Sequence, residues 1–204
     1  MLKGALHIHS TYSDGEFTLG ELRDVYLADG CRFACVSDHA DWFDEGRLES
    51  YIRECAALSD DRFRFIAGLE FPCVECLHIV GYGVTRLVGA MDPRAVIAHI
   101  EACGGVSVIA HPKDAHFEWI GGFAVLPQGV EVWNSKYDGR YAPRPGTFGL
   151  VRRLLRVGQV HDGVDRHEAA RGRVVLAGAE VGEAGRILHA ADEAARAWPG
   201  RPRP

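Results

Sequence analysis

The chain lacks long hydrophobic runs: none of its apolar stretches approaches the ~20 residues that cross a bilayer. No charged leader with an apolar segment precedes the first polar motif at residues 7–9, so we expect neither a secretory signal nor a membrane partner. The cysteines also lack the regular spacing of a disulfide-rich protein. The 6 cysteines are scattered, and Cys73 and Cys76 form a lone CxxC pair where a structural zinc site needs two pairs. These absences favour reduced thiols and a cytoplasmic location.

A basic excess is missing as well. The formal net charge is −5, and no basic stripe is visible that would follow the backbone of a long nucleic acid. The sequence contains no internal repeat and no low-complexity stretch. Its 204 residues, 47% of them hydrophobic, can bury one sizeable core. We therefore expect a single domain over residues 1–198, with a flexible, proline-rich tail at 199–204.

Strand-like apolar runs alternate with helical patterns along the whole chain. The expected strands are 2–8, 33–36, 63–69, 77–82, 106–110, 130–133, 159–161 and 174–177. The expected helices are 18–28, 47–58, 91–103, 148–157 and 183–198. Thr18 with Glu21 forms a capping box, and Asp92 caps a helix that has Pro93 at its first position. The alternation indicates an α/β fold with a parallel sheet, and about seven repeats in one domain favour a barrel.

Histidines and carboxylates stand at the ends of these strand-like runs, where barrels gather their functional groups. His7 and His9 are two residues apart, so in a strand they face the same side, and the same holds for Asp165 and His167. Imidazoles and carboxylates from several strand ends suit a site for more than one divalent cation. The alternative for such a histidine pair is an ordinary polar strand face.

Three other residues have plain alternatives when each is taken alone. Asp14 lies in a turn-like segment, His78 fits a satisfied histidine at a strand edge, and His111 fits a neutral core imidazole. Glu70 ends an apolar run, where an unpaired carboxylate is costly to bury and a cation would remove that cost. We find it improbable that all these alternatives hold together at successive strand ends.

Further polar residues suggest roles in catalysis and substrate binding. Asp38 and His39 are adjacent, so one of them should be a ligand and the other a supporting or capping group. Lys136 and Arg140 follow a predicted strand and are candidates for binding a phosphate group. The alternative for Lys136 and for Arg140 is an ordinary exposed side chain in a loop.

In this order the motifs resemble those of the PHP (polymerase and histidinol phosphatase) superfamily of metal-dependent phosphoesterases, from about residue 6 to residue 167. The resemblance implies a distorted (β/α)7, TIM-barrel-like fold and two or three divalent ions, either Zn, Mn or Fe. It implies these metal ligands: His7, His9, Asp14, His39, Glu70, His78, His111, Asp165 and His167.

The resemblance also implies how the ligands are shared. One ion would be held by His7, His9, Glu70 and Asp165. A second would be held by Glu70, as a bridge, with His78 and His111, and a third by Asp14, His39 and His167. One departure from the family pattern is that Ala5-Leu6 stands where an acidic residue often precedes the first motif.

These features predict an enzyme that hydrolyses a small phosphate ester through a metal-activated hydroxide. The candidate general acid is a metal-bound water or Asp38, and Lys136 and Arg140 would bind the substrate. We expect a small phosphorylated metabolite or nucleotide, with phosphomonoesters favoured over phosphodiesters. Two alternatives stay open: a non-catalytic metal-binding structural or interaction module, and a metal-dependent hydrolase of non-phosphate esters or amides. The complete ligand set favours an enzyme.

Overall fold

The computed structural model of the protein describes residues 3–74, 77–111, 127–131 and 174–176. Its strands are β1 (Gly4–Ile8), β2 (Phe33–His39), β3 (Arg64–Pro72), β4 (His78–Tyr82), β5 (Val106–Ile109), β6 (Gly129–Glu131) and β7 (Val174–Leu176). Its helices are α1 (Leu19–Ala28), the 3-10 turn η1 (Ala40–Trp42), α2 (Glu45–Ala57) and α3 (Pro93–Ala102).

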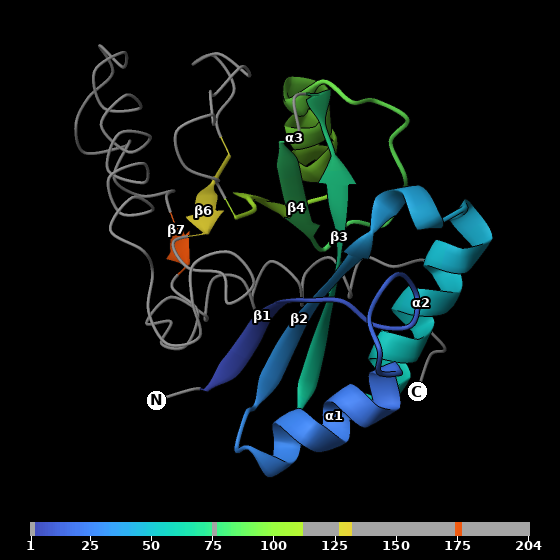
Figure 1. The fold of residues 1–204 in the computed structure, drawn as a ribbon, viewed down its shortest axis with the longest axis vertical. Helices are drawn as coiled ribbons and strands as arrows, with labels where there is room; N and C mark the ends of the chain where they lie inside the picture. The colour runs from blue at the N-terminus through green and yellow to red at the C-terminus, as the bar shows by residue number, and fades with distance from the viewer. Residues whose placement is uncertain (1–2, 75–76, 112–126, 132–173, 177–204) are drawn as a thin grey trace.

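The strands form one sheet in the order β1-β2-β3-β4-β5-β6-β7, so each strand pairs with its neighbours along the chain. The sheet curls from β1 to β7 (Figure 1). Helix α1 packs against β2, α2 against β3, and α3 against β4 and β5. This α/β arrangement agrees with the expected TIM-barrel-like class.

The expectation of a wholly parallel sheet is wrong in one place. Strand β4 runs antiparallel to both β3 and β5, while the other neighbouring pairs are parallel. The cause is the short connection 73–77, because a parallel crossover needs about a dozen residues or more. The reversal places the start of β4 beside the end of β3, with His78 opposite Pro72. His78 therefore reaches the same sheet edge as the residues that end parallel strands.

Local signals in the sequence predicted the helix starts well. Thr18 and Glu21 form the expected capping box of α1, and Asp92 caps α3 with Pro93 in its first turn. Helix α2 begins two residues earlier than expected, because the side chain of Asp44 accepts from the backbone N–H of Arg47. The elements expected at 148–157, 159–161 and 183–198 lie outside the described residues.

The core lies between the sheet and the helices. Leu48 and Tyr51 of α2 and Ile97 and Ile100 of α3 are almost completely buried. The Tyr51 hydroxyl also donates to the carbonyl oxygen of Gly68 at 3.1 Å, which ties α2 to β3. This packing holds the ends of β2 and β3, which carry several of the predicted ligands.

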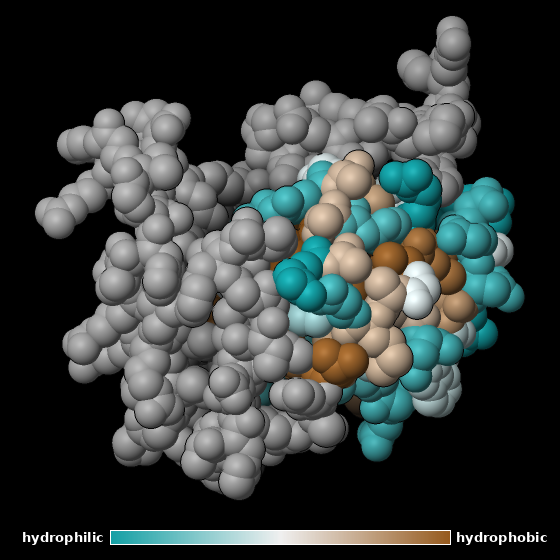
Figure 2. Space-filling view, turned by 90° about the horizontal axis from the view of Figure 1, so that it is seen from above, coloured by the Kyte–Doolittle hydropathy of each residue, from teal (hydrophilic) through white to brown (hydrophobic). Residues whose placement is uncertain are grey.

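The surface of the described part is mixed. Figure 2 shows hydrophobic and hydrophilic residues interspersed on one face, with hydrophilic side chains gathered along one rim. Among the described helices, none is long and apolar enough to pass through a bilayer. The cysteines described as free are Cys31, Cys35, Cys55, Cys73 and Cys103.

We predict that Thr18→Ala lowers the free energy of unfolding by about 1 kcal/mol, because it removes the N-cap acceptor of α1. Urea unfolding of the two proteins measures this difference. Ser50→Ala is the matched control, since the Ser50 hydroxyl is exposed and donates only to the carbonyl of Gly46 within α2. The control should change stability by less than about 0.5 kcal/mol. Equal losses in both variants would contradict the capping role.

Candidate metal centre

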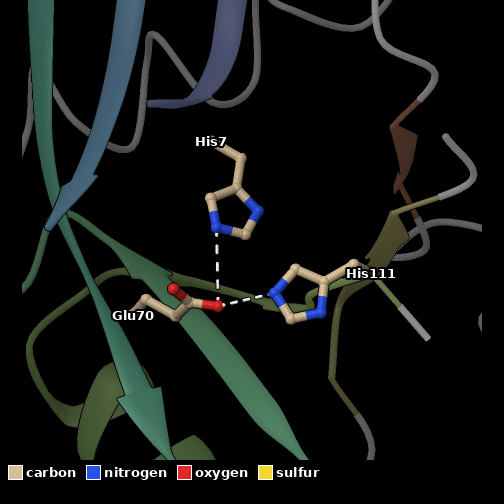
Figure 3. Close-up of side chains that lie close together, drawn as sticks. All are labelled: His7, Glu70 and His111. Carbon is tan, nitrogen blue, oxygen red and sulfur yellow. Dashed lines mark hydrogen bonds and ion pairs between the residues drawn. The ribbon is translucent and has the colours of Figure 1, made fainter. Parts of the chain in front are cut away.

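Glu70, near the end of β3, is the centre of the predicted site. Its side chain is 1% exposed, and its Oε1 faces three imidazole nitrogens. These are Nδ1 of His78 at 2.7 Å, Nε2 of His111 at 2.8 Å and Nε2 of His7 at 3.5 Å. Figure 3 shows His7 and His111 reaching the same carboxylate oxygen. Imidazoles from β1, from β4 and from the segment after β5 thus meet at one oxygen atom.

The other oxygen of Glu70 faces a second set of histidines. Oε2 lies 3.1 Å from Nε2 of His9 and 3.3 Å from Nδ1 of His39. Both histidines also contact Asp14: His9 Nδ1 lies 2.6 Å from Asp14 Oδ1, and His39 Nε2 lies 3.5 Å from Asp14 Oδ2. The Asp14 side chain is 46% exposed, so this side of the cluster opens toward solvent.

Two groups of potential ligand atoms are close enough to hold a cation each, and Glu70 belongs to both. One is His7, Glu70 and His111, and the other is His9, His39 and Glu70, with the ligand atoms of each group within 4.8 Å of one another. A carboxylate whose two oxygens face separate imidazoles is suited to bridging two cations. Mixed nitrogen and oxygen donors fit zinc, manganese and iron.

The two groups place His7 with His111 and His9 with His39, while the ion shared by His7, His9, Glu70 and Asp165 stays a prediction because Asp165 lies outside the described residues. The cause of this placement is the backbone. Strand β1 changes register with β2 between Ala5 and Ile8, and His7 has a left-handed φ of 55°. His7 and His9 therefore do not follow regular strand alternation, and they approach opposite oxygens of Glu70.

Contacts within the cluster shift the pKa values of Glu70 and His7 strongly. Burial raises the pKa of Glu70, but hydrogen bonds from His111, His7, His78 and His9 outweigh it and hold that pKa well below its usual range. Burial likewise opposes protonation of His7, whose contacts with Glu131 and Glu70 nevertheless raise its pKa to about 10. Without metal, the buried Glu70 carboxylate thus favours the protonated form of His7.

We predict that metal binding at pH 7 releases protons, because His7 is protonated in the metal-free protein and a ligand must be neutral. The pKa of His7 rises from 6.5 to about 10 on folding. Its protonation therefore stabilises the metal-free fold below pH 6.5 and ceases to do so as the pH rises through about 10. Metal affinity should rise with pH over the same interval.

Calorimetric titration with Zn²⁺ at pH 7, in two buffers of different ionisation enthalpy, measures this release. The apparent binding enthalpies should differ in proportion to the released protons. Identical enthalpies in both buffers would contradict the prediction.

Asp38 lies within β2 and is completely buried, with 0% exposure. Its carboxylate accepts from the backbone N–H of Ser10 at 2.8 Å and from its hydroxyl at 2.8 Å, and from the Ser13 hydroxyl at 2.7 Å. It therefore holds the segment that carries Asp14. Of the two roles expected for the adjacent pair, Asp38 has the supporting one and His39 faces the cluster. The role of Asp38 as general acid stays a prediction.

The sequence interpretation missed Glu131 at the end of β6. Its Oε2 lies 3.3 Å from His7 Nδ1 and accepts from the backbone N–H of His111. Its side chain is 12% exposed. The signal that identified Glu70, a carboxylate directly after a buried apolar strand residue, applies here as well, since Val130 is buried.

The remaining predicted residues lie outside the described part of the chain. These are the ligands Asp165 and His167 and the substrate-binding candidates Lys136 and Arg140. Their roles stay predictions.

Comparison with known proteins supports the resemblance at the level of the fold. No family model matches the sequence. An alignment over 77 residues is 31% identical to the DNA polymerase/3'-5' exonuclease PolX of Bacillus subtilis and covers 34% of this chain and 14% of that protein.

Two solved structures share the architecture. A proposed metal-dependent phosphoesterase from Bifidobacterium adolescentis has a TM-score of 0.57 and 14% identity, over 92% of this chain and 96% of its own. A two-domain protein from Bacteroides vulgatus, which contains a proposed PHP-like metal-dependent phosphoesterase, has a TM-score of 0.57 and 16% identity, over 76% of this chain and 49% of its own. These likenesses show that the chain shares the fold of the two proteins.

Proposed function

We propose that this protein is a metal-dependent hydrolase that cleaves a small phosphate ester, with phosphomonoesters favoured over phosphodiesters. The observation that carries the proposal is the position of Glu70, buried between two sets of imidazoles that face its two oxygens. A buried carboxylate with this many nitrogen donors around it fits a bridging ligand between divalent cations. The likeness in fold to metal-dependent phosphoesterases supports the same conclusion.

The described residues have distinct roles in this proposal. The two groups around Glu70 would each hold a cation, and Asp14 with His39 would contribute to a third site. When bound, the cations would lower the pKa of a water molecule and neutralise the oxygens of the phosphoryl group. The side of the cluster at His9 and Asp14 is the more exposed one, so we place the approach of the substrate there.

Residues beyond the described part complete the proposal. Asp165 and His167 would supply the last two ligands, and Lys136 and Arg140 would orient the phosphate group. We also propose that the curled sheet belongs to a distorted (β/α)7 barrel within one domain over residues 1–198. The reduced thiols expected from the sequence favour a cytoplasmic enzyme.

A non-catalytic metal-binding module is the main alternative, and a hydrolase of non-phosphate esters is the other. The convergence of seven predicted ligands disfavours the first, because a structural site needs only a closed set of about four donors. These seven are His7, His9, Asp14, His39, Glu70, His78 and His111.

The test is a substrate panel with protein that has been stripped of metal and reloaded with Zn²⁺, Mn²⁺ or Fe²⁺. The panel contains an aryl phosphate, an aryl phosphodiester and an aryl carboxylate ester, and elemental analysis accompanies it. We expect two or three ions per chain and the fastest turnover on the monoester. Turnover on the carboxylate ester alone would contradict phosphate chemistry, and bound metal without any turnover would favour the non-catalytic module.

We further predict a preference for short substrates, since the net charge of −5 disfavours a long polyanion. The measurement compares turnover of a nucleoside monophosphate, a small phosphodiester and a long single-stranded DNA at one phosphate concentration. The monophosphate should be cleaved fastest. A preference for the long strand at low salt would refute this prediction.

A further inference from the structure

Glu131 contacts both histidines of one ligand group. That group is His7, Glu70 and His111, and the two contacts of Glu131 are made by the same oxygen, Oε2. We propose that Glu131 is a positioning residue that fixes His7 with its proton on Nδ1, so that Nε2 is free to bind a cation beside Glu70. The proposal rests on the metal site inferred above.

The side-chain geometry supports this assignment. His7 presents Nδ1 to Glu131 at 3.3 Å and Nε2 to Glu70 at 3.5 Å. An ionised carboxylate only accepts hydrogen bonds, so Glu131 favours the form of His7 that carries hydrogen on Nδ1. Carboxylates that hold the second nitrogen of a metal-binding histidine fix the orientation of its ring and increase its basicity as a ligand.

The backbone geometry gives Glu131 a second role. His7 and His111 are the two non-glycine residues with positive φ in the described part of the chain, at 55° and 23°. Side chains of this size are disfavoured in that region, so such a conformation persists only where the surroundings hold it. Tyr82 accepts from the backbone N–H of His7 at 3.2 Å, and Glu131 accepts from the backbone N–H of His111. Each N–H that leaves regular strand pairing is thus satisfied by a side chain.

The position of Glu131 in the sheet explains why one residue can contact both the ring of His7 and the backbone N–H of His111. Strand β6 follows β5, which leads to His111, whereas β1 lies at the far end of the strand order. The contact with His7 therefore joins strands that are not paired with each other. Removal of Glu131 should loosen His7 and His111 together and leave His9 and His39, which face the other oxygen of Glu70, in place.

The test is a Co²⁺ titration of wild type, Glu131→Ala, Glu131→Gln and Gln128→Ala, followed by visible absorption. We expect Glu131→Ala to weaken one of the bound Co²⁺ ions by ~10–100-fold and to leave another within about twofold of wild type. Glu131→Gln should recover most of this loss, because an amide oxygen in the place of Oε2 can accept both hydrogen bonds.

Gln128→Ala is the matched control. Gln128 precedes the same strand, and its side-chain oxygen accepts from the backbone N–H of Ser107 at 2.7 Å and from the Ser107 hydroxyl at 3.0 Å. Like Glu131→Ala, the Gln128→Ala substitution removes a side-chain acceptor from a backbone N–H, here that of Ser107 in β5. Its Co²⁺ affinities should equal those of wild type. An equal loss of affinity in Gln128→Ala and Glu131→Ala would reduce Glu131 to a structural role and overturn the proposal.

A second measurement is made on the wild type, so it does not depend on whether a Glu131 variant folds. Long-range ¹H–¹⁵N correlation of the zinc-loaded wild type, with His7 assigned by comparison with His7→Gln, should place the His7 proton on Nδ1. A proton on Nε2, or Co²⁺ affinities of Glu131→Ala within twofold of wild type throughout, overturns the proposal. Failure of the wild type itself to bind Co²⁺ would instead overturn the metal site, so the two failures are distinguishable.

Discussion

Glu70→Gln is expected to abolish turnover and to reduce the metal content by at least one ion per chain. The substitution keeps the size of the side chain but replaces one carboxylate oxygen by an NH₂ group, which cannot bind a cation. Because the two oxygens face different histidine groups, the loss disturbs both sites. The activity should fall by well over the ~100-fold that is typical for residues that only support ligands.

Two further variants are compared with Glu70→Gln. Lys136→Ala removes a group proposed only to orient the substrate, so it should reduce activity less and leave the metal content unchanged. Glu49→Gln is the matched chemical control, because the Glu49 side chain is 53% exposed and pairs only loosely with Arg53 at 4.0 Å. Elemental analysis and turnover of the best substrate measure all three. Near-normal metal content and activity in Glu70→Gln would show that Glu70 does not bridge.

The sequence was sufficient for those site residues whose signal is local. Glu70 follows a run of apolar residues and therefore had to be compensated after burial. Thr18 with Glu21, and Asp92 with Pro93, identified helix starts because capping depends on neighbours in sequence. These signals operate within a few residues, which is why composition and spacing captured them.

Features that depend on pairing between distant strands were not accessible in the same way. The grouping of His7 with His111 follows from the register change in β1 and from left-handed backbone at both residues. The antiparallel direction of β4, which brings His78 to Glu70, follows from a short turn rather than from a strand pattern. Glu131 carried the same local signal as Glu70, but its contacts with two histidines appear only when β6 is placed in the sheet.

The substitution Asp38→Asn distinguishes a supporting role of Asp38 from a catalytic one. We expect it to reduce both the free energy of unfolding and the affinity for metal. The Asp38 carboxylate accepts three hydrogen bonds from Ser10 and Ser13 while fully buried. An asparagine places an NH₂ donor against one or more of these donors, which leaves buried polar groups unsatisfied. The cost should be ~1–3 kcal/mol in the free energy of unfolding. The segment that carries Asp14 should become less well held, so the affinity for a cation near Asp14 should fall by ~10–100-fold.

Asp44→Asn is the matched control for this experiment. Asp44 caps α2 by accepting from the backbone N–H of Arg47 at 2.7 Å, and asparagine serves almost equally well at that position. Urea unfolding and metal titration of both variants measure the difference. A general acid at Asp38 would give the opposite pattern: unchanged stability and metal content, with a lower kcat and loss of the alkaline limb of its pH profile. Because Asp38 is buried beneath the segment that carries Asp14, we expect Asp38→Asn to change stability and metal affinity rather than kcat alone.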